Sequence, residues 1–179
     1  MIGTTYKIAD KSLRYLSCWL YSSSDSRVPP GLSYHLSEIW LTELGKASAV
    51  ATAQKPVPMK FVLAPFLALA AMTQNRVTYQ QIQANLIDPL LSALSPPPCS
   101  ADLPPPPKRL KATATRDDIP DLLANSCLSP QDGPSDRSQL RKGVLEYIFE
   151  VASQEDSRDS NRRKLYAICN ANIDEDDDV

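Results

Sequence analysis

Histidine, glycine and cysteine are scarce in this chain of 179 residues, which has one His, five Gly and four Cys. The glycines form no Gly-rich loop, and this excludes both a dinucleotide-binding fingerprint and a phosphate-binding P-loop. The four cysteines include no Cys-x-x-Cys pair, so a zinc site would need distant single ligands, and we expect neither a metal nor a cofactor. The four cysteines are consistent with free thiols in a reducing intracellular compartment. They are Cys18, Cys99, Cys127 and Cys169.

Long apolar runs and a large excess of one charge are also absent. The longest apolar stretch, Phe61–Met72, contains Pro65 and is far shorter than the ~20 residues that span a bilayer, so we expect no membrane contact. Five of the 21 acidic residues lie at 174–178, which leaves 19 basic and 16 acidic residues in the body. The body is therefore nearly neutral, and the acidic tail is expected to be solvated or to compete for basic partners.

Proline is abundant, and ten of the sixteen prolines lie between residues 95 and 135. Proline lacks the backbone N–H that helices and sheets require, and this segment has few apolar residues. We therefore predict an extended, largely disordered insert, in which Asp117–Leu123 forms at most a transient helical turn. The predicted parts of the chain are a helical region, this insert, a C-terminal helical pair and an acidic tail, over residues 1–94, 95–135, 136–170 and 171–179.

Outside the insert, apolar residues recur at helical spacing, and no segment shows the period-two alternation of a strand. We therefore predict an all-α fold. The clearest apolar stripe runs from Leu32 to Leu44, with Gly45 in the position of a C-cap. Further helices are expected over residues 7–21, 61–72, 77–94, 140–152 and around 165–168.

Two prolines are expected to interrupt these helices. Pro65 lies inside one apolar segment and Pro89 inside the next. Asp88 before Pro89 fits an N-cap followed by proline at the first helical position. The sequence therefore predicts a broken or restarted helix at both places.

His35, the single histidine, lies three residues before Glu38 on the helix predicted from Leu32 to Leu44. A His–Glu pair at this spacing can share a hydrogen bond and serve acid–base chemistry. A lone helix histidine more often fixes a local contact, and this interpretation is favoured. Since no other catalytic set stands out, we expect no enzymatic activity and no small-molecule substrate.

One basic cluster follows a run of four prolines and consists of Lys108, Arg109 and Lys111. A basic cluster held extended by prolines is the form that the acidic groove of a nuclear import receptor recognises. We interpret it as a nuclear import signal, and the alternative is a chance cluster in a linker.

A second basic cluster lies near the C-terminus, with Tyr166 close by. Its spacing could form a surface that contacts RNA phosphates. The residues taken alone favour an ordinary solvated face that Asp156 and Asp159 partly neutralise. The basic residues are Arg158, Arg162, Arg163 and Lys164.

Several separated segments form a recognisable series. Val28–Leu44 has a Pro-Gly turn that leads into a helix ending in an acidic residue and Leu, and Ala64–Asn75 has a Pro-Phe helix followed by a Thr-x-Asn turn. With Asp88–Leu91, Phe149–Ser153 and Asn161–Tyr166, this series resembles the ribosomal RNA-processing protein 1 family of nucleolar proteins. The motif residues expected at a surface or in packing are Gly31, Tyr34, His35, Trp40, Glu43, Pro65 and Phe66.

The resemblance implies a HEAT-like array of stacked helices and a non-enzymatic assembly factor. Family members are nucleolar, associate with precursor ribosomal particles, chiefly those of the large subunit, and are needed for pre-rRNA processing. The implied partners are pre-rRNA, other assembly factors and a nuclear import receptor. Because only residues 10–20 look like the end of the family's upstream helical half, the chain is expected to begin within the family domain.

An alternative function is a nuclear helical adaptor that binds other proteins without direct RNA contact. In that case Trp40 or Tyr34 would lie on the surface that binds the partner.

Overall fold

The computed structural model describes residues 31–50, 56–95, 118–129 and 131–173, and this part is mostly α-helical, which confirms the all-α prediction. The helix expected over residues 7–21, the basic cluster at 108–111 and the acidic run at 174–178 lie outside the described residues. In chain order the elements are α2 (Gly31–Val50), β1 (Val57–Pro58), α3 (Met59–Met72), α4 (Arg76–Ile82), the π-helix η1 (Gln83–Ile87), α5 (Asp88–Leu94), α6 (Asp118–Ala124), β2 (Ser126–Cys127), α7 (Arg137–Ser153) and α8 (Asp159–Ile173).

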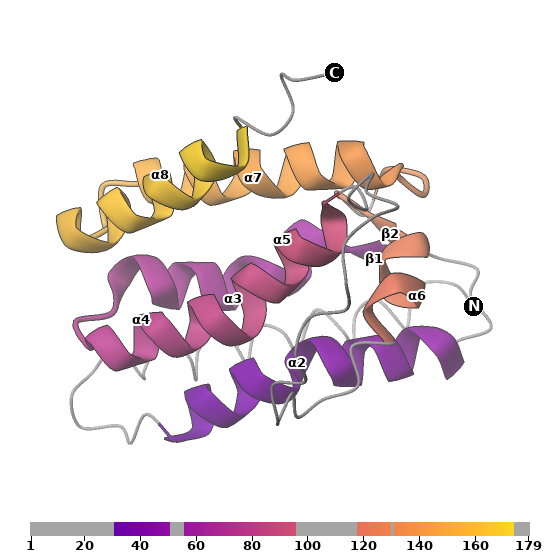
Figure 1. Cartoon of the computed structure of the whole chain (residues 1–179), viewed down its shortest axis with the longest axis horizontal. Coiled ribbons are helices and arrows are strands. Elements are labelled where there is room, and N and C mark those ends of the chain that lie inside the picture. Colours follow the sequence, from indigo (N-terminus) through magenta and orange to yellow (C-terminus); the bar gives the residue numbers. More distant parts are fainter. Residues whose placement is uncertain (1–30, 51–55, 96–117, 130, 174–179) are drawn as a thin grey trace, which may run out of the picture.

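The helices are stacked in layers (Figure 1). The pair α7 and α8 lies on one side, α3 and the α4–η1–α5 segment form the middle, and α2 lies on the other side with α6. In the middle layer, α3 contacts both α7 and α8, and α2 contacts α4, η1 and α6. The apolar residues of α3, such as Leu63 and Phe66, are buried between the outer layers. This stacking agrees with the predicted helical array.

Helix α2 is longer than the sequence indicates. Gly45 does not cap α2, because the helix continues to Val50 and Gly45 is buried inside it. A glycine inside a helix costs about 0.5–1 kcal/mol relative to alanine. The contacts that α2 makes with α6 outweigh this cost, so the prediction of a C-cap at Gly45 is wrong.

Pro65 does not end its helix, whereas the helix before Pro89 is interrupted by a π-helical turn and restarts as α5 with the proline in its first turn, as predicted. Pro65 is buried inside α3, which continues through it to Met72, and the packing of α3 on both sides offsets the ~3 kcal/mol that an interior proline costs. Asp88 is not an N-cap, because its φ of −62° and ψ of −44° are helical. The π-helical turn directly before it, closed by the bond from the Asp88 N–H to the Gln83 carbonyl, widens the helix and accommodates Pro89 instead.

Part of the proline-rich segment folds into the core. The prediction that Asp117–Leu123 forms only a transient turn is wrong, because α6 buries Ile119, Leu122 and Leu123. Only residues 96–117 and 130 of this segment lie outside the described residues, where disorder stays a prediction. The prediction failed because it relied on the high proline content of the whole segment and gave too little weight to these three apolar residues.

A short parallel strand pair fixes this segment to the helices. Val57 of β1 pairs with Ser126 of β2, and the Val57 N–H donates to the Asn125 carbonyl at 2.8 Å. Leu128, just beyond β2, packs on α7 at Gly143. A Cβ on that glycine would lie 2.5 Å from the Leu128 methyl carbons, so the absence of a side chain permits the close approach.

The burial of α6 predicts that its apolar residues stabilise the whole fold. Leu122→Ala should lower the free energy of unfolding by about 3 kcal/mol, since Leu122 is fully buried and its truncation leaves a cavity. Urea unfolding followed by circular dichroism measures this change. Ala124→Ser, at an exposed position of the same helix, is the control and should stay within about 0.5 kcal/mol of the native protein. Equal stabilities of the two variants would contradict the packing of α6.

Candidate functional site

The motif residues of the N-terminal half meet one another inside the fold. The hydroxyl groups of Tyr34 in α2 and Thr78 in α4 share a hydrogen bond of 3.3 Å. The Asn75 side-chain amide donates to the Tyr34 hydroxyl at 3.3 Å, and its Oδ1 caps α4 by accepting from the Val77 N–H at 2.9 Å. The Thr-x-Asn turn and Tyr34 therefore join α2 to the start of α4.

Trp40 and Phe66 form a second contact between motifs. Their ring centroids lie 5.2 Å apart at an angle of 55°, and Phe66 is fully buried beside Pro65. Trp40 is half-buried, with its indole N–H inside the protein. The structure therefore places Trp40, like Tyr34, in contacts within the fold.

The polar motif residues of α2 lie at its surface. Gly31, His35 and Glu38 are exposed, and the structure shows no hydrogen bond between His35 and Glu38. Glu43 is also exposed and pairs with Lys46 at 2.8 Å. Within the ranges that the structure describes, no acidic side chain pairs with His35.

The first turns of α8 carry the C-terminal motif, and its first residue, Asn161, is buried. The Asn161 amide donates to the carbonyls of Thr73 at 2.8 Å and Ala71 at 3.3 Å. The backbone N–H of Arg158 donates to the same Ala71 carbonyl at 3.1 Å. These bonds satisfy carbonyls at the C-terminal end of α3 that have no helical partner.

Arg162 binds the end of α7 in the same way. Its guanidinium donates to the carbonyls of Ala152 and Gln154, both at 3.0 Å, and of Ser157 at 3.2 Å. It also pairs with Asp159 at 3.3 Å. A positive charge at a helix C-terminus is favourable because the exposed carbonyls there carry partial negative charge. Arg162 was predicted to contact phosphates, but its donors are used within the fold.

Lys164 is directed toward α4. Its ammonium nitrogen lies 4.5 Å from the ring centroid of Tyr79, which is a cation–π contact. Burial of Tyr79, together with the nearby negative charge of Asp88, raises the pKa of its phenol to about 12, so the ring stays neutral at physiological pH. Lys164 therefore helps to join α8 to α4.

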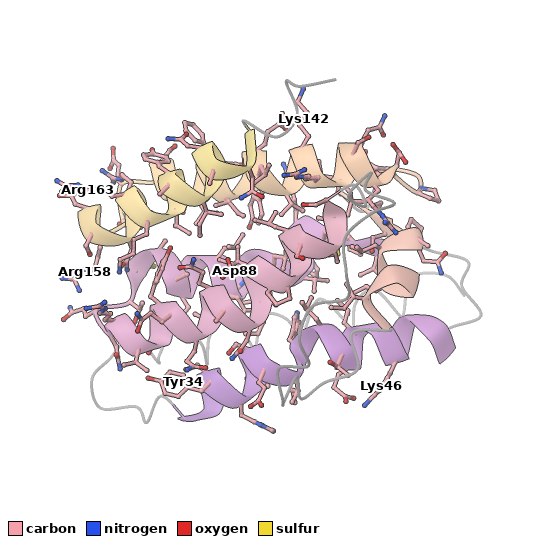
Figure 2. All side chains as sticks on the ribbon, viewed as in Figure 1. Tyr34, Lys46, Asp88, Lys142, Arg158 and Arg163 are labelled. Carbon is pink, nitrogen blue, oxygen red and sulfur yellow. The ribbon has the colours of Figure 1, made fainter. Side chains whose placement is uncertain are left out.

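Arg158 and Arg163 are the two exposed members of the predicted cluster, and neither side chain makes an ion pair within the described ranges. Figure 2 shows both at the same end of the molecule, beside the turn between α7 and α8. Arg76, at the start of α4, is also exposed, and α4 begins directly after the turn that Asn161 binds. The exposed acids Glu155 and Asp156 lie in the turn between α7 and α8.

An aromatic pair lies next to this basic surface. The sequence pattern placed Phe149 beside the apolar stripe of α7, but 54% of its surface is exposed. Its ring lies 5.0 Å from that of Tyr166, whose hydroxyl shares a hydrogen bond of 3.2 Å with Ser153. This exposure is hard to predict from the sequence, because Phe149 lies only one residue from the buried stripe that contains Ile148.

The described residues contain no group of three or more His, Cys, Asp or Glu arranged to hold a metal ion. Cys127 and Cys169 are free thiols, and burial raises the pKa of both. Among the helices described, none is both long and apolar enough to cross a membrane.

The fold and this surface define a class: an all-α protein of stacked helices, with exposed arginines beside an aromatic pair at one end. A family model described as "Nucleolar protein, Nop52" matches residues 4–169. The chain therefore belongs to the Nop52 family of nucleolar proteins, which confirms the resemblance to the ribosomal RNA-processing protein 1 family. It is a nucleolar ribosome biogenesis factor, and membership implies association with precursor ribosomal particles. No curated protein and no solved structure is significantly similar to the chain.

The same substitution should destabilise the protein at Arg162 but have almost no effect on stability at Arg163. Arg162→Met should lower the free energy of unfolding by about 1–3 kcal/mol, because carbonyls at the end of α7 lose their donors. Arg163→Met should change it by no more than about 0.5 kcal/mol, since Arg163 is exposed. Thermal and urea unfolding of both variants measure the difference. A destabilisation by Arg163→Met as large as that by Arg162→Met would show that the turn is held in another way.

Proposed function

We propose that the chain acts in pre-rRNA processing as a non-enzymatic helical scaffold on precursor ribosomal particles, chiefly those of the large subunit. In this proposal Arg158 and Arg163 contact rRNA phosphates, and the helical faces hold other assembly factors. Family membership supports the association with precursor ribosomal particles in the nucleolus. The observation that supports the RNA contact is the division of the basic cluster, because Arg162 and Lys164 join helices while Arg158 and Arg163 stay exposed.

The fixed backbone of the turn favours such a contact. Arg158 is held through its backbone N–H at the end of α3, and Arg163 follows the anchored Arg162 in α8. Their side chains therefore extend from a rigid base, which reduces the conformational entropy lost when a phosphate binds. Positively charged side chains that neutralise phosphates release counterions, so binding should weaken as salt increases.

Entry into the nucleus is proposed to depend on Lys108, Arg109 and Lys111, which would bind the acidic groove of an import receptor. This cluster lies outside the described residues.

Charge reversal tests the RNA contact. Arg158→Glu combined with Arg163→Glu should weaken association with precursor rRNA and lower the salt dependence of binding, by about 1.4 in the slope of log K against log salt for a single strand. The affinity of the purified chain for RNA, measured at several salt concentrations, provides this slope. The control is Arg137→Glu with Lys142→Glu, which makes the same change in net charge near the start of α7.

Sucrose-gradient sedimentation of the tagged chain from cells tests the scaffold. The native chain and the control variant should sediment with precursors of the large subunit, and the Arg158 and Arg163 double variant should shift toward the top of the gradient. If the double variant sediments with the precursors and binds RNA like the native chain, the adaptor without RNA contact is the better description. The contacts of Tyr34 and Trp40 within the fold already argue against those two residues as the adaptor's docking surface.

A further inference from the structure

Phe149 is an apolar ring at the surface of α7, and it lies outside the buried core cluster. In the described part of the chain, Phe149 and Val77 are the large apolar residues whose surface is about half exposed. Exposed single apolar residues are common in proteins, so exposure alone assigns no role. What distinguishes Phe149 is its partner, because Tyr166 of α8 lies against it.

The pair is held in a defined geometry. The ring centroids are 5.0 Å apart with a tilt of 36°, and the hydrogen bond between Tyr166 and Ser153 fixes the far end of the tyrosine. Tyr166 therefore supports one side of Phe149 while much of the Phe149 ring stays open to solvent. A ring that is already held in place loses little conformational freedom when a second planar group stacks on it.

Arg163 adds a positive charge to the same surface. It lies three residues before Tyr166 in α8, a spacing that puts the two side chains on one face of the helix. Figure 2 shows Arg163 at the outer end of α8. Tyr166 thus contacts the Phe149 ring and shares a face of α8 with the exposed Arg163.

We propose that the outer face of α7 and α8 binds unpaired RNA, with one base stacked on Phe149 and an adjacent phosphate paired with Arg163. This proposal rests on the RNA contact of the proposed function and adds the form of RNA that is bound. Proteins that bind single strands combine aromatic rings, on which bases stack, with positive charges that follow the phosphates.

The surroundings of Phe149 favour a base over an apolar protein surface. Exposed neighbours on the two helices are charged, polar or small, and they include two acids: Glu146, Glu150, Ser153, Ala167 and Asn170. A protein-docking face is expected to offer a continuous apolar patch of several hundred Å². A single open ring with polar neighbours and a free arginine matches a planar base with its phosphate.

Two substitutions of Phe149 separate stacking from general apolar contact. Phe149→Leu keeps an apolar side chain but removes the aromatic face, and Phe149→Trp keeps the face. The purified full chain is titrated with a fluorescein-labelled 12-nucleotide oligoadenylate and with a 20-base-pair RNA duplex, and binding is followed by fluorescence anisotropy. Phe149→Leu should weaken binding of the single strand about tenfold, and Phe149→Trp should not. Binding of the duplex should be unchanged in both, and thermal unfolding confirms that both variants fold.

The outcomes distinguish this proposal from the one on which it rests. If Phe149→Leu binds the single strand as tightly as the native chain, the stacking site is overturned. The proposed phosphate contact would still stand if the Arg158 and Arg163 double variant loses the salt-sensitive binding. A native chain that binds neither RNA overturns both. Sedimentation in cells provides a further test. If Phe149→Asp no longer sediments with precursors but Phe149→Leu still does, Phe149 makes an apolar protein contact and the stacking site is overturned as well.

Discussion

The hydrogen bonds from Asn161 and Arg162 to main-chain carbonyls hold together the end of the molecule where the candidate site lies. Asn161 binds the C-terminal end of α3, and Arg162 binds the C-terminal end of α7. These two residues are adjacent in sequence but join two different helices to the start of α8. Carbonyls at helix ends lack helical partners, so donors from a neighbouring turn are the natural way to satisfy them. These bonds position the turn between α7 and α8 and the exposed Arg158 and Arg163 beside it.

The basic run of α8 therefore combines structure and surface within a few residues. Arg162 and Lys164 are directed into the fold, where one binds carbonyls and the other contacts Tyr79. Arg163 between them is exposed, because successive residues of a helix face different directions. A count of positive charges overestimates the surface available to a ligand, since only those side chains without an internal role contribute to it.

The sequence predicted much of the helical content and the family, but not how individual side chains are used. The stripes of α2 and α7 follow from apolar spacing alone, as does the burial of Leu140 and Val144. The roles of Arg162 and Phe149 could not be predicted, since both depend on which helix packs against α7 and on how the two helices are aligned along their axes. The helix α6 was missed because its seven residues lie in a segment whose average composition is that of a linker. Pro65 was misjudged since local preference ignores the packing that surrounds α3.

The position of α3 in the middle layer has a consequence for how the protein is synthesised. Its apolar residues, Leu69 among them, pack against helices that come much later in the chain, including the segment around Leu165. Leu165 follows Leu69 by 96 positions, so at ordinary elongation rates roughly 5–20 s separate their emergence from the ribosome. During that interval α3 can contact α2 and α4, but the apolar surface that α7 and α8 later bury stays uncovered. The core around α3 is therefore completed only after α8, the last helix of the described chain, has left the ribosome.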